Sequence, residues 1–248
     1  MSIALIAITD SSYTSAKRLQ RLLSESEVID VRGKGRLRSW VDEHFHEYEG
    51  LVFFMAQGIV YRVIASHITS KYEDPAVVVV DDACRYAIAA LSGHEGGANT
   101  LAWKVASLLN AEPVITTASD TRKSFVLGIG CRKGVSVQEI ITAVDEGLER
   151  VGIDRSEVRI CASAWLKSDE RGLIEGCERM DLPILFLPED RLKHFTGAQT
   201  LSDAAQRRFG IEGVAEPCAL LTGKNARLVL PRIVVGKVTI AIVKEELA

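Results

Sequence analysis

The sequence lacks the signals of several protein classes. Its five cysteines are odd in number and widely spaced, and no Cys-x-x-Cys pair occurs. This pattern argues against a disulfide framework or a structural zinc site and favours reduced thiols. The apolar N-terminus has no basic leader, and no apolar run approaches the roughly 18 residues that a membrane span needs. We therefore expect a cytoplasmic protein with no membrane partner.

The sequence also has little excess charge of either sign. The sequence has 30 basic and 33 acidic residues, so its formal net charge is −3. We expect no general attraction to nucleic acid, although a local basic pocket is compatible with this balance. The hydrophobic fraction of 47% and charged fraction of 25% are typical of globular proteins, and 248 residues suffice for two domains.

What the sequence does contain is an alternation of short apolar runs with helical patterns. Six runs in the first half are predicted strands: 3–8, 28–31, 51–55, 76–80, 86–91 and 113–117. Three more, 125–129, 158–162 and 183–187, precede a predicted hairpin of 227–230 and 237–243. The alternation predicts an α/β fold of two lobes, each a mostly parallel sheet flanked by helices, with a C-terminal β-hairpin.

A polar break at 121–124 separates the two halves of the chain. We therefore predict an N-terminal α/β domain of residues 1–121 and a C-terminal α/β domain of residues 125–248. Capping residues mark two of the helices. Ser11 and Ser12 can cap the first helix, while Ser136 and Glu139 form a capping box for a helix that ends at Gly152.

Segment 92–99 joins a predicted strand to a predicted helix and contains three glycines. Glycine permits a left-handed backbone, and a helix N-terminus offers free N–H groups to a carboxylate or phosphate. His94 can donate a hydrogen bond or carry a proton near neutral pH. The alternative is a tight turn with a solvated histidine. The spacing matches neither the dinucleotide fingerprint nor the Walker loop.

Polar residues also gather where the apolar run 113–117 stops, at Thr116, Thr117 and Asp120. The carboxyl ends of strands form the ligand crevice of open parallel sheets, so these residues are candidate ligand contacts. Ordinary turn and capping chemistry is an equal alternative.

Segment 128–134 again follows a strand and precedes a helix, which predicts a second glycine-rich loop. Arg132 and Lys133 in it suit anionic groups. Cys131 could have a depressed pKa beside these cations, but we favour the alternative of a packed thiol.

Two further charged residues have two interpretations each. Pro217 suits the first position of a helix, which would place Glu216 at the cap; a catalytic role is the alternative. Arg62 is a solvated charge unless the turn at Gly58 faces the ligand. The chain is thus predicted to be an enzyme that binds a polyanionic small molecule at strand ends between its two lobes.

Taken in order, these stretches resemble the cobalt-precorrin-5A hydrolase family, the ring-opening enzymes of the anaerobic cobalamin pathway. The motifs are Gly58-Ile59-Val60-Tyr61-Arg62, Asp74 to Asp81, Ser92 to Asn99, Val114 to Asp120, Gly128 to Gly134, Val214 to Ala219 and Lys237 to Val243. Many family members carry a middle segment after the Thr-Thr-Ala motif, whereas only seven residues separate Asp120 from Gly128 here. We therefore expect a short form of the family.

The resemblance implies a substrate and a reaction. The substrate would be a cobalt-bearing macrocycle with acetate and propionate arms and a δ-lactone at ring A. Water would open the lactone, and a two-carbon fragment would leave as acetaldehyde to give cobalt-precorrin-5B. The cobalt would arrive with the substrate, so no cofactor or metal site of the protein is expected. A homodimer and transient contacts with neighbouring pathway enzymes remain open.

For such a reaction we hypothesise roles for the candidate residues. His94 or Glu216 would activate water, and Asp120 is a second candidate base for a retro-aldol-like carbon–carbon cleavage. Backbone N–H groups would hold the oxyanion or an acetate arm. The expected substrate-binding residues are Gly58, Arg62, Gly93, Gly96, Gly97, Asn99, Thr116, Thr117, Gly130, Cys131, Arg132 and Lys133.

Three alternatives compete with this hydrolase. One is a non-catalytic protein that binds or carries a corrinoid intermediate. Another is an acyl-transfer hydrolase that depends on Cys131. The third is a phosphate or nucleotide module, which the absence of the Walker and dinucleotide spacings makes less favoured.

Overall fold

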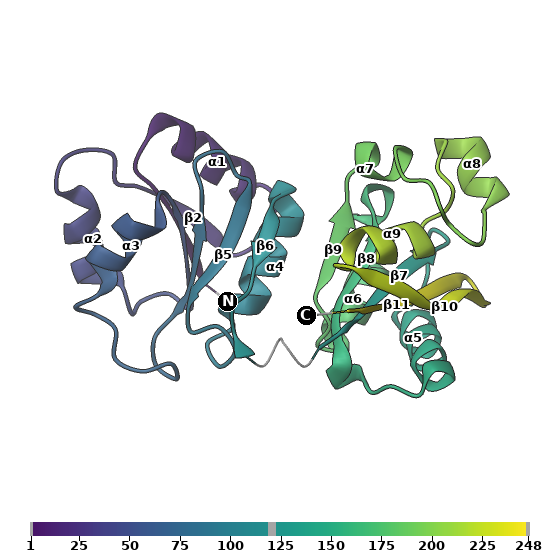
Figure 1. Ribbon diagram of the computed structural model, residues 1–248. Helices are drawn as coiled ribbons and strands as arrows, with labels where there is room; N and C mark the ends of the chain where they lie inside the picture. Colours follow the sequence, from purple (N-terminus) through teal and green to yellow (C-terminus); the bar gives the residue numbers. More distant parts are fainter. Residues whose placement is uncertain (1, 119–122, 247–248) are drawn as a thin grey trace. The chain divides into compact units, whose positions relative to one another are not determined.

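A computed structural model describes residues 2–118 and 123–246 of the chain. The chain divides into two compact units, Met1–Thr117 (unit 1) and Ala118–Ala248 (unit 2). Each unit contains one β-sheet flanked by helices, which confirms the predicted α/β class (Figure 1). The predicted boundary at 121–124 falls partly on residues outside the described ranges. Within those ranges, no helix has the length and apolar character that crossing a membrane requires.

Unit 1 is built on a six-stranded sheet of order β2-β1-β3-β4-β5-β6. Its elements are β1 (Ile3–Ala7), α1 (Asp10–Gln20), β2 (Ser26–Asp30), α2 (Arg36–His44), β3 (Gly50–Phe54), α3 (Gln57–Ile64), β4 (Ala76–Val80), β5 (Tyr86–Leu91), α4 (Ala98–Leu109) and β6 (Glu112–Val114). Strands β1 to β4 are mutually parallel, whereas β5 pairs antiparallel with β4 and parallel with β6.

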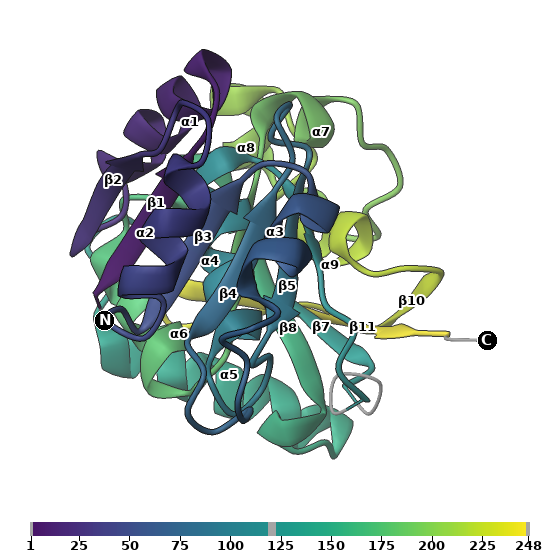
Figure 2. The ribbon, with the colours of Figure 1, turned by 90° about the vertical axis from the view of Figure 1, so that its left-hand side faces the viewer.

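Helices cover both faces of this sheet. The core on one face joins alternate strand residues to α1 and α4, and the core on the other face joins them to α2 and α3. Figure 2 shows α2 and α3 side by side over the strands. The valine run of β4 is buried completely because its side chains alternate between these two cores.

The reversed direction of β5 divides the strand ends of unit 1 between two edges of the sheet. The carboxyl ends of strands β1 to β4 all point the same way, and this side of the sheet is called here the β1–β4 carboxyl edge. The ends of β5 and β6 lie at the opposite edge, called the β5–β6 carboxyl edge, beside the start of β4, because Leu91 pairs with Val77. The five residues of β4 separate these edges by about 16 Å.

Unit 2 is built on a five-stranded sheet of order β10-β11-β7-β8-β9. Its elements are β7 (Phe125–Cys131), α5 (Val137–Val151), β8 (Val158–Ala164), α6 (Arg171–Arg179), β9 (Ile184–Leu187), α7 (Glu189–Lys193), α8 (Asp203–Phe209), α9 (Ala215–Thr222), β10 (Ala226–Val235) and β11 (Val238–Glu245), with 3₁₀ turns at Arg155–Glu157 and Trp165–Lys167. Strands β7, β8 and β9 are parallel. In the predicted C-terminal hairpin, β10 pairs antiparallel with β11, and β11 pairs antiparallel with β7.

The helix caps agree with the sequence in one case and differ in another. Ser136 and Glu139 form the predicted capping box of α5, and left-handed Gly152 ends the helix. The predicted cap of α1 is wrong, because Thr9 is the N-cap and Ser12 occupies the third helical position of a capping box. Thr9 takes this place because its backbone is still extended two residues beyond β1.

Gly128 allows α9 to lie directly on β7. A Cβ atom at this position would come within 1.8 Å of the Ala215 carbonyl oxygen, which belongs to the helix backbone and cannot rotate away. We expect Gly128→Ala to lower the free energy of unfolding of unit 2 by about 3 kcal/mol or more, measured by urea denaturation. Gly213→Ala is the matched control, since its Cβ would meet no atom closer than 3.8 Å. Equal urea midpoints for both variants would contradict this packing.

Candidate functional site

A loop of residues 92–97, called here the Gly-rich loop, follows β5 at the β5–β6 carboxyl edge. Two backbone hydrogen bonds close it, from Ala98 N to Ser92 O at 3.1 Å and from Asn99 N to Gly93 O at 2.9 Å. Left-handed Gly97 is the N-cap of α4, which has no side-chain cap. Within the described residues, no hydrogen bond engages the N–H groups of Gly96 and Gly97. These two N–H groups lie just before a 12-residue helix, whose N-terminal dipole favours a nearby anion.

Thr117, which follows β6, packs directly against the Gly-rich loop. The Asn99 side-chain amide donates to Thr117 Oγ1 at 2.8 Å. Gly93 leaves room for this contact, because its Cβ would lie 2.6 Å from Thr117 Cγ2 and 2.8 Å from Asn99 Oδ1. The structure thus brings together three of the predicted binding residues. Thr116 is exposed beside them, and Asp120 lies outside the described residues.

Two buried oxygen atoms of this site have no hydrogen-bond partner among the described residues: Ser92 Oγ and Asn99 Oδ1. Ser92 is only 6% exposed, and its φ of 56° is left-handed. An unpaired buried polar group costs about 1–3 kcal/mol, and a strained backbone costs a similar amount. Such costs gather at functional sites. Ser92 is not among the predicted site residues, because nothing in its sequence motif indicates a buried side chain or a strained backbone.

His94 lies exposed in the Gly-rich loop, where a ligand can reach its imidazole. The neighbouring Glu95 forms an ion pair with Lys71 at 2.5 Å. The hydrogen bond from Lys71 lowers the pKa of Glu95, so this carboxylate remains charged beside His94. The loop therefore combines an imidazole with backbone donors.

A rigid turn supports the loop from the side of β4. The buried carboxylate of Asp74 accepts hydrogen bonds from the backbone N–H groups of Thr69 and Ser70 and from the Thr69 hydroxyl, at 2.8–3.1 Å. Gly96 passes close to this turn, because its Cβ would lie 3.3 Å from the Asp74 carbonyl oxygen. The carboxylate thus fixes the backbone against which the Gly-rich loop packs.

Gly58 and Arg62 do not join this site. Both belong to α3, which begins at the β1–β4 carboxyl edge. The predicted binding residues of unit 1 are divided between the two edges, because β5 runs antiparallel to β4. Gly58 and Arg62 therefore lie at the opposite edge from His94.

The strand predicted at 125–129 continues two residues further, so the predicted Gly-rich loop is wrong for Gly130 and Cys131. Strand β7 continues through Cys131, and Gly130 pairs with Thr239 of β11. A Cβ on Gly130 would lie 2.5 Å from Thr239 Oγ1, so this glycine serves strand packing. The pattern Gly-x-Gly carried no sign that distinguished close packing from ligand binding.

Exposed cations follow β7 in unit 2. Arg132 and Lys133 form the turn after the strand, and the backbone N–H of Arg132 donates to Lys237 O at 3.0 Å. The Gly134 N–H donates to the Glu170 carboxylate at 3.0 Å, which fixes the turn. The turn therefore presents two basic side chains from an ordered backbone.

Cys131 is a packed thiol, as favoured from the sequence. Burial raises its pKa to about 11, and nearby Lys167 only partly opposes this. The alternative of a depressed pKa is therefore wrong. We expect iodoacetamide to alkylate Cys131 at neutral pH about 100-fold more slowly than free cysteine, measured by peptide mass spectrometry. Alkylation as fast as that of free cysteine would contradict the buried thiol.

Glu216 is almost completely buried, with 1% of its surface exposed. Its carboxylate accepts from Thr200 N at 2.9 Å and from Arg232 N at 2.7 Å. Burial opposes its ionisation, but these hydrogen bonds outweigh it and lower the pKa of Glu216. The predicted cap is wrong, since Val214 is the N-cap of α9. Glu216 thus joins α9 to β10 and to the segment at Thr200.

These features define an α/β protein of two units with an exposed histidine beside the uncapped N-terminus of α4. Residues 39–120 match the family described as Cobalamin synthesis G N-terminal, and residues 125–243 match Cobalamin synthesis G C-terminus. The chain belongs to this cobalamin synthesis family, and its role lies in cobalamin biosynthesis.

Individual proteins are similar to all or part of this chain. The cobalt-precorrin-5A hydrolase of Priestia megaterium is 25% identical over an alignment that covers 96% of this chain and 94% of that protein. The cobalt-precorrin-5A hydrolase of Salmonella typhimurium is 40% identical over 51% of this chain and 38% of that protein. Among solved structures, cobalamin biosynthesis protein chiG from Agrobacterium tumefaciens is 38% identical over 49% of this chain and 98% of that chain, with a TM-score of 0.40.

Proposed function

We propose that this protein hydrolyses the ring-A δ-lactone of cobalt-precorrin-5A, releases acetaldehyde and forms cobalt-precorrin-5B. The observation that carries this proposal is the pair of unengaged N–H groups at Gly96 and Gly97 beside the exposed His94. The relatives named cobalt-precorrin-5A hydrolase support it independently.

The first step is attack of water on the lactone carbonyl. His94 takes a proton from the water, and the new C–O bond places negative charge on the carbonyl oxygen. The N–H groups of Gly96 and Gly97 stabilise this oxyanion with the aid of the α4 dipole. Collapse of the intermediate breaks the ring ester bond, and the proton returns to the departing alkoxide. The ring-A acetate and a hydroxyl group result.

The second step is cleavage of a carbon–carbon bond. A base removes the proton of the new hydroxyl, its oxygen forms the aldehyde carbonyl, and the bonding electron pair passes to the macrocycle carbon, which is then protonated. In this proposal His94 acts again after its first proton transfer, and Asp120 stays the second candidate base. Atoms balance, with one water consumed and one acetaldehyde released.

The remaining unit 1 residues would position the macrocycle. Asn99, Thr117 and Gly93 would shape the floor of the loop on which the substrate rests. Unit 2 offers a carboxylate-binding position of its own at Arg132 and Lys133. The cobalt ion belongs to the substrate, and no step proposed uses a metal held by the protein.

Isotope labelling tests the proposal. The protein would be incubated anaerobically with cobalt-precorrin-5A in water enriched in oxygen-18, and the corrinoid product analysed by mass spectrometry. Attack at the carbonyl predicts one heavy oxygen in the ring-A carboxylate of the product. A product without the label, or substrate recovered unchanged, would overturn the proposed reaction.

A further inference from the structure

The segment of residues 32–38, called here the basic loop, follows β2 at the β1–β4 carboxyl edge. It reads Arg32-Gly33-Lys34-Gly35-Arg36-Leu37-Arg38, with four cations in seven residues. Left-handed Gly33 and Gly35 give it a compact turn. The segment precedes residue 39, where the matched family range begins.

Only one of the loop cations is neutralised. Arg32 pairs with Asp30 and Asp10, and its hydrogen bonds lower the pKa of Asp30 to about 2. The other three side chains make no ion pair with any described residue: Lys34, Arg36 and Arg38. All three are exposed. The basic loop thus retains a positive charge on a protein whose net charge is −3.

Two helix N-termini lie beside these cations. Helices α2 and α3 are side by side on one face of the sheet and begin at the same edge (Figure 2). The Arg38 guanidinium donates to Arg62 O at 3.2 Å, which ties the two helices together. Neither helix has a side-chain cap. Arg62 reaches back over the first turn of α3, since its Nη1 would lie 3.5 Å from a Cβ on Gly58.

We propose that the basic loop and the first turn of α3 form a binding site for a compact, multiply charged oxyanion. Guanidinium and ammonium groups from Lys34, Arg36 and Arg62 would contact the anion, and the uncapped N–H groups of α3 would complete the site. Helix α3 begins after β3, beside the reversal of chain order between β1 and β3, which is the usual place for ligands in such sheets. The basic loop follows the edge strand β2, on the other side of β1. A phosphate group and a cluster of carboxylates share this chemistry.

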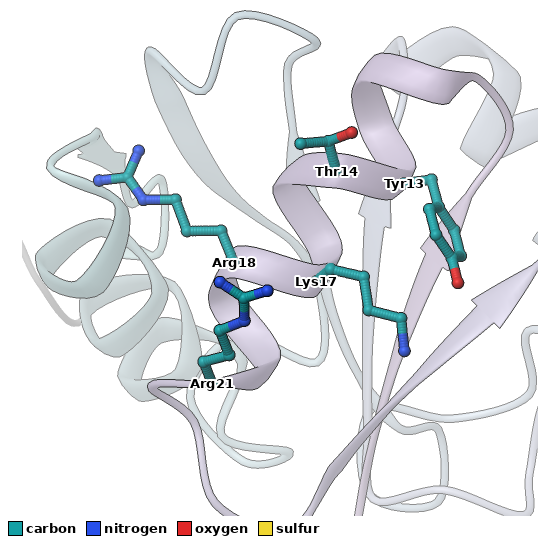
Figure 3. A pocket seen from close by; sticks show the side chains of 5 residues that line it. All are labelled: Tyr13, Thr14, Lys17, Arg18 and Arg21. Carbon is teal, nitrogen blue, oxygen red and sulfur yellow. The ribbon is translucent and has the colours of Figure 1, made fainter.

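A second group of cations in unit 1 does not have this arrangement. Lys17, Arg18 and Arg21 line a surface hollow of about 350 Å³ along α1, together with Tyr13 and Thr14. Figure 3 shows Arg18 and Lys17 pointing to opposite sides of the helix, so these charges diverge. The α1 arginines therefore provide a matched control of equal charge.

The test is isothermal titration calorimetry of the purified full chain, with pyrophosphate and citrate as separate titrants. The test variants are the double substitution Lys34→Gln, Arg36→Gln and the single substitution Arg62→Gln. The control is the double substitution Arg18→Gln, Arg21→Gln. We expect the test variants to bind about tenfold more weakly than the native chain and the control to bind within twofold of it. Thermal unfolding checks that each variant is folded.

Each outcome of the titrations either supports or overturns the proposed site. Binding of pyrophosphate alone supports the site and indicates a phosphate-bearing ligand, while binding of citrate supports it and indicates carboxylate arms. Binding of neither anion, or equal weakening by the α1 control, would overturn the proposal. No corrinoid or turnover enters this experiment, so its failure would leave the hydrolase proposal untouched.

Discussion

Replacing His94 with alanine is expected to lower the rate constant for acetaldehyde release about 100-fold or more, because the reaction would lose the group that takes a proton from water. Substrate affinity should change only a few-fold, since the backbone donors at Gly96 and Gly97 remain. The measurement is single-turnover kinetics with substrate bound, read through the formation of aldehyde.

His46→Ala is the matched control, because His46 is also an exposed histidine of unit 1 but lies beyond the end of α2. This variant should turn over at the native rate. If His94→Ala kept a rate within a few-fold of the native protein, the imidazole would have no part in proton transfer, and Asp120 would become the first candidate base.

Replacing Glu216 with alanine is expected to lower the free energy of unfolding by about 3 kcal/mol. The substitution leaves the partly buried N–H groups of Thr200 and Arg232 without the Glu216 acceptor. Urea denaturation followed by tryptophan fluorescence of unit 2 measures this loss. Glu189→Ala removes an exposed carboxylate whose ion-pair partner among the described residues is Lys193, so this control should lie within about 0.5 kcal/mol of the native chain.

The lowered pKa of Glu216 adds a dependence on pH. Because the pKa is lower in the folded chain, its stabilising contribution is complete above the unfolded pKa of about 4 to 5 and is lost as the pH falls through the folded value. The native chain should therefore lose stability more steeply below this range than Glu216→Ala. Identical acid profiles would contradict an anchoring carboxylate.

The strands of this protein could be predicted from its sequence, but the direction of one of them was missed. The runs at 76–80 and 86–91 are both β-strands, as expected. An apolar run carries no information on direction, and the alternating pattern elsewhere suggested a parallel sheet. A signal was present, since the five residues 81–85 between the runs are too few for a parallel crossover.

The candidate site was predictable where neighbouring strand ends meet. Gly93, Asn99 and Thr117 come together because β5 and β6 are parallel neighbours. The same reasoning could not separate the packing glycines of β7 from ligand-binding glycines, because both are selected for the absence of a Cβ atom.

Buried carboxylates posed a different difficulty. The partners of Glu216 are backbone groups sixteen residues away on either side, at Thr200 and Arg232. Such contacts depend on tertiary packing, so local sequence gives no sign of them. The same applies to the unpaired Ser92 hydroxyl.

The most direct test of the proposed activity is acetaldehyde release from cobalt-precorrin-5A under anaerobic conditions, coupled to NADH loss through alcohol dehydrogenase. We predict catalytic release of one aldehyde per corrinoid converted, with many turnovers per protein. A corrinoid spectrum that shows binding while no aldehyde appears would contradict the hydrolase and identify the chain as a corrinoid-binding protein.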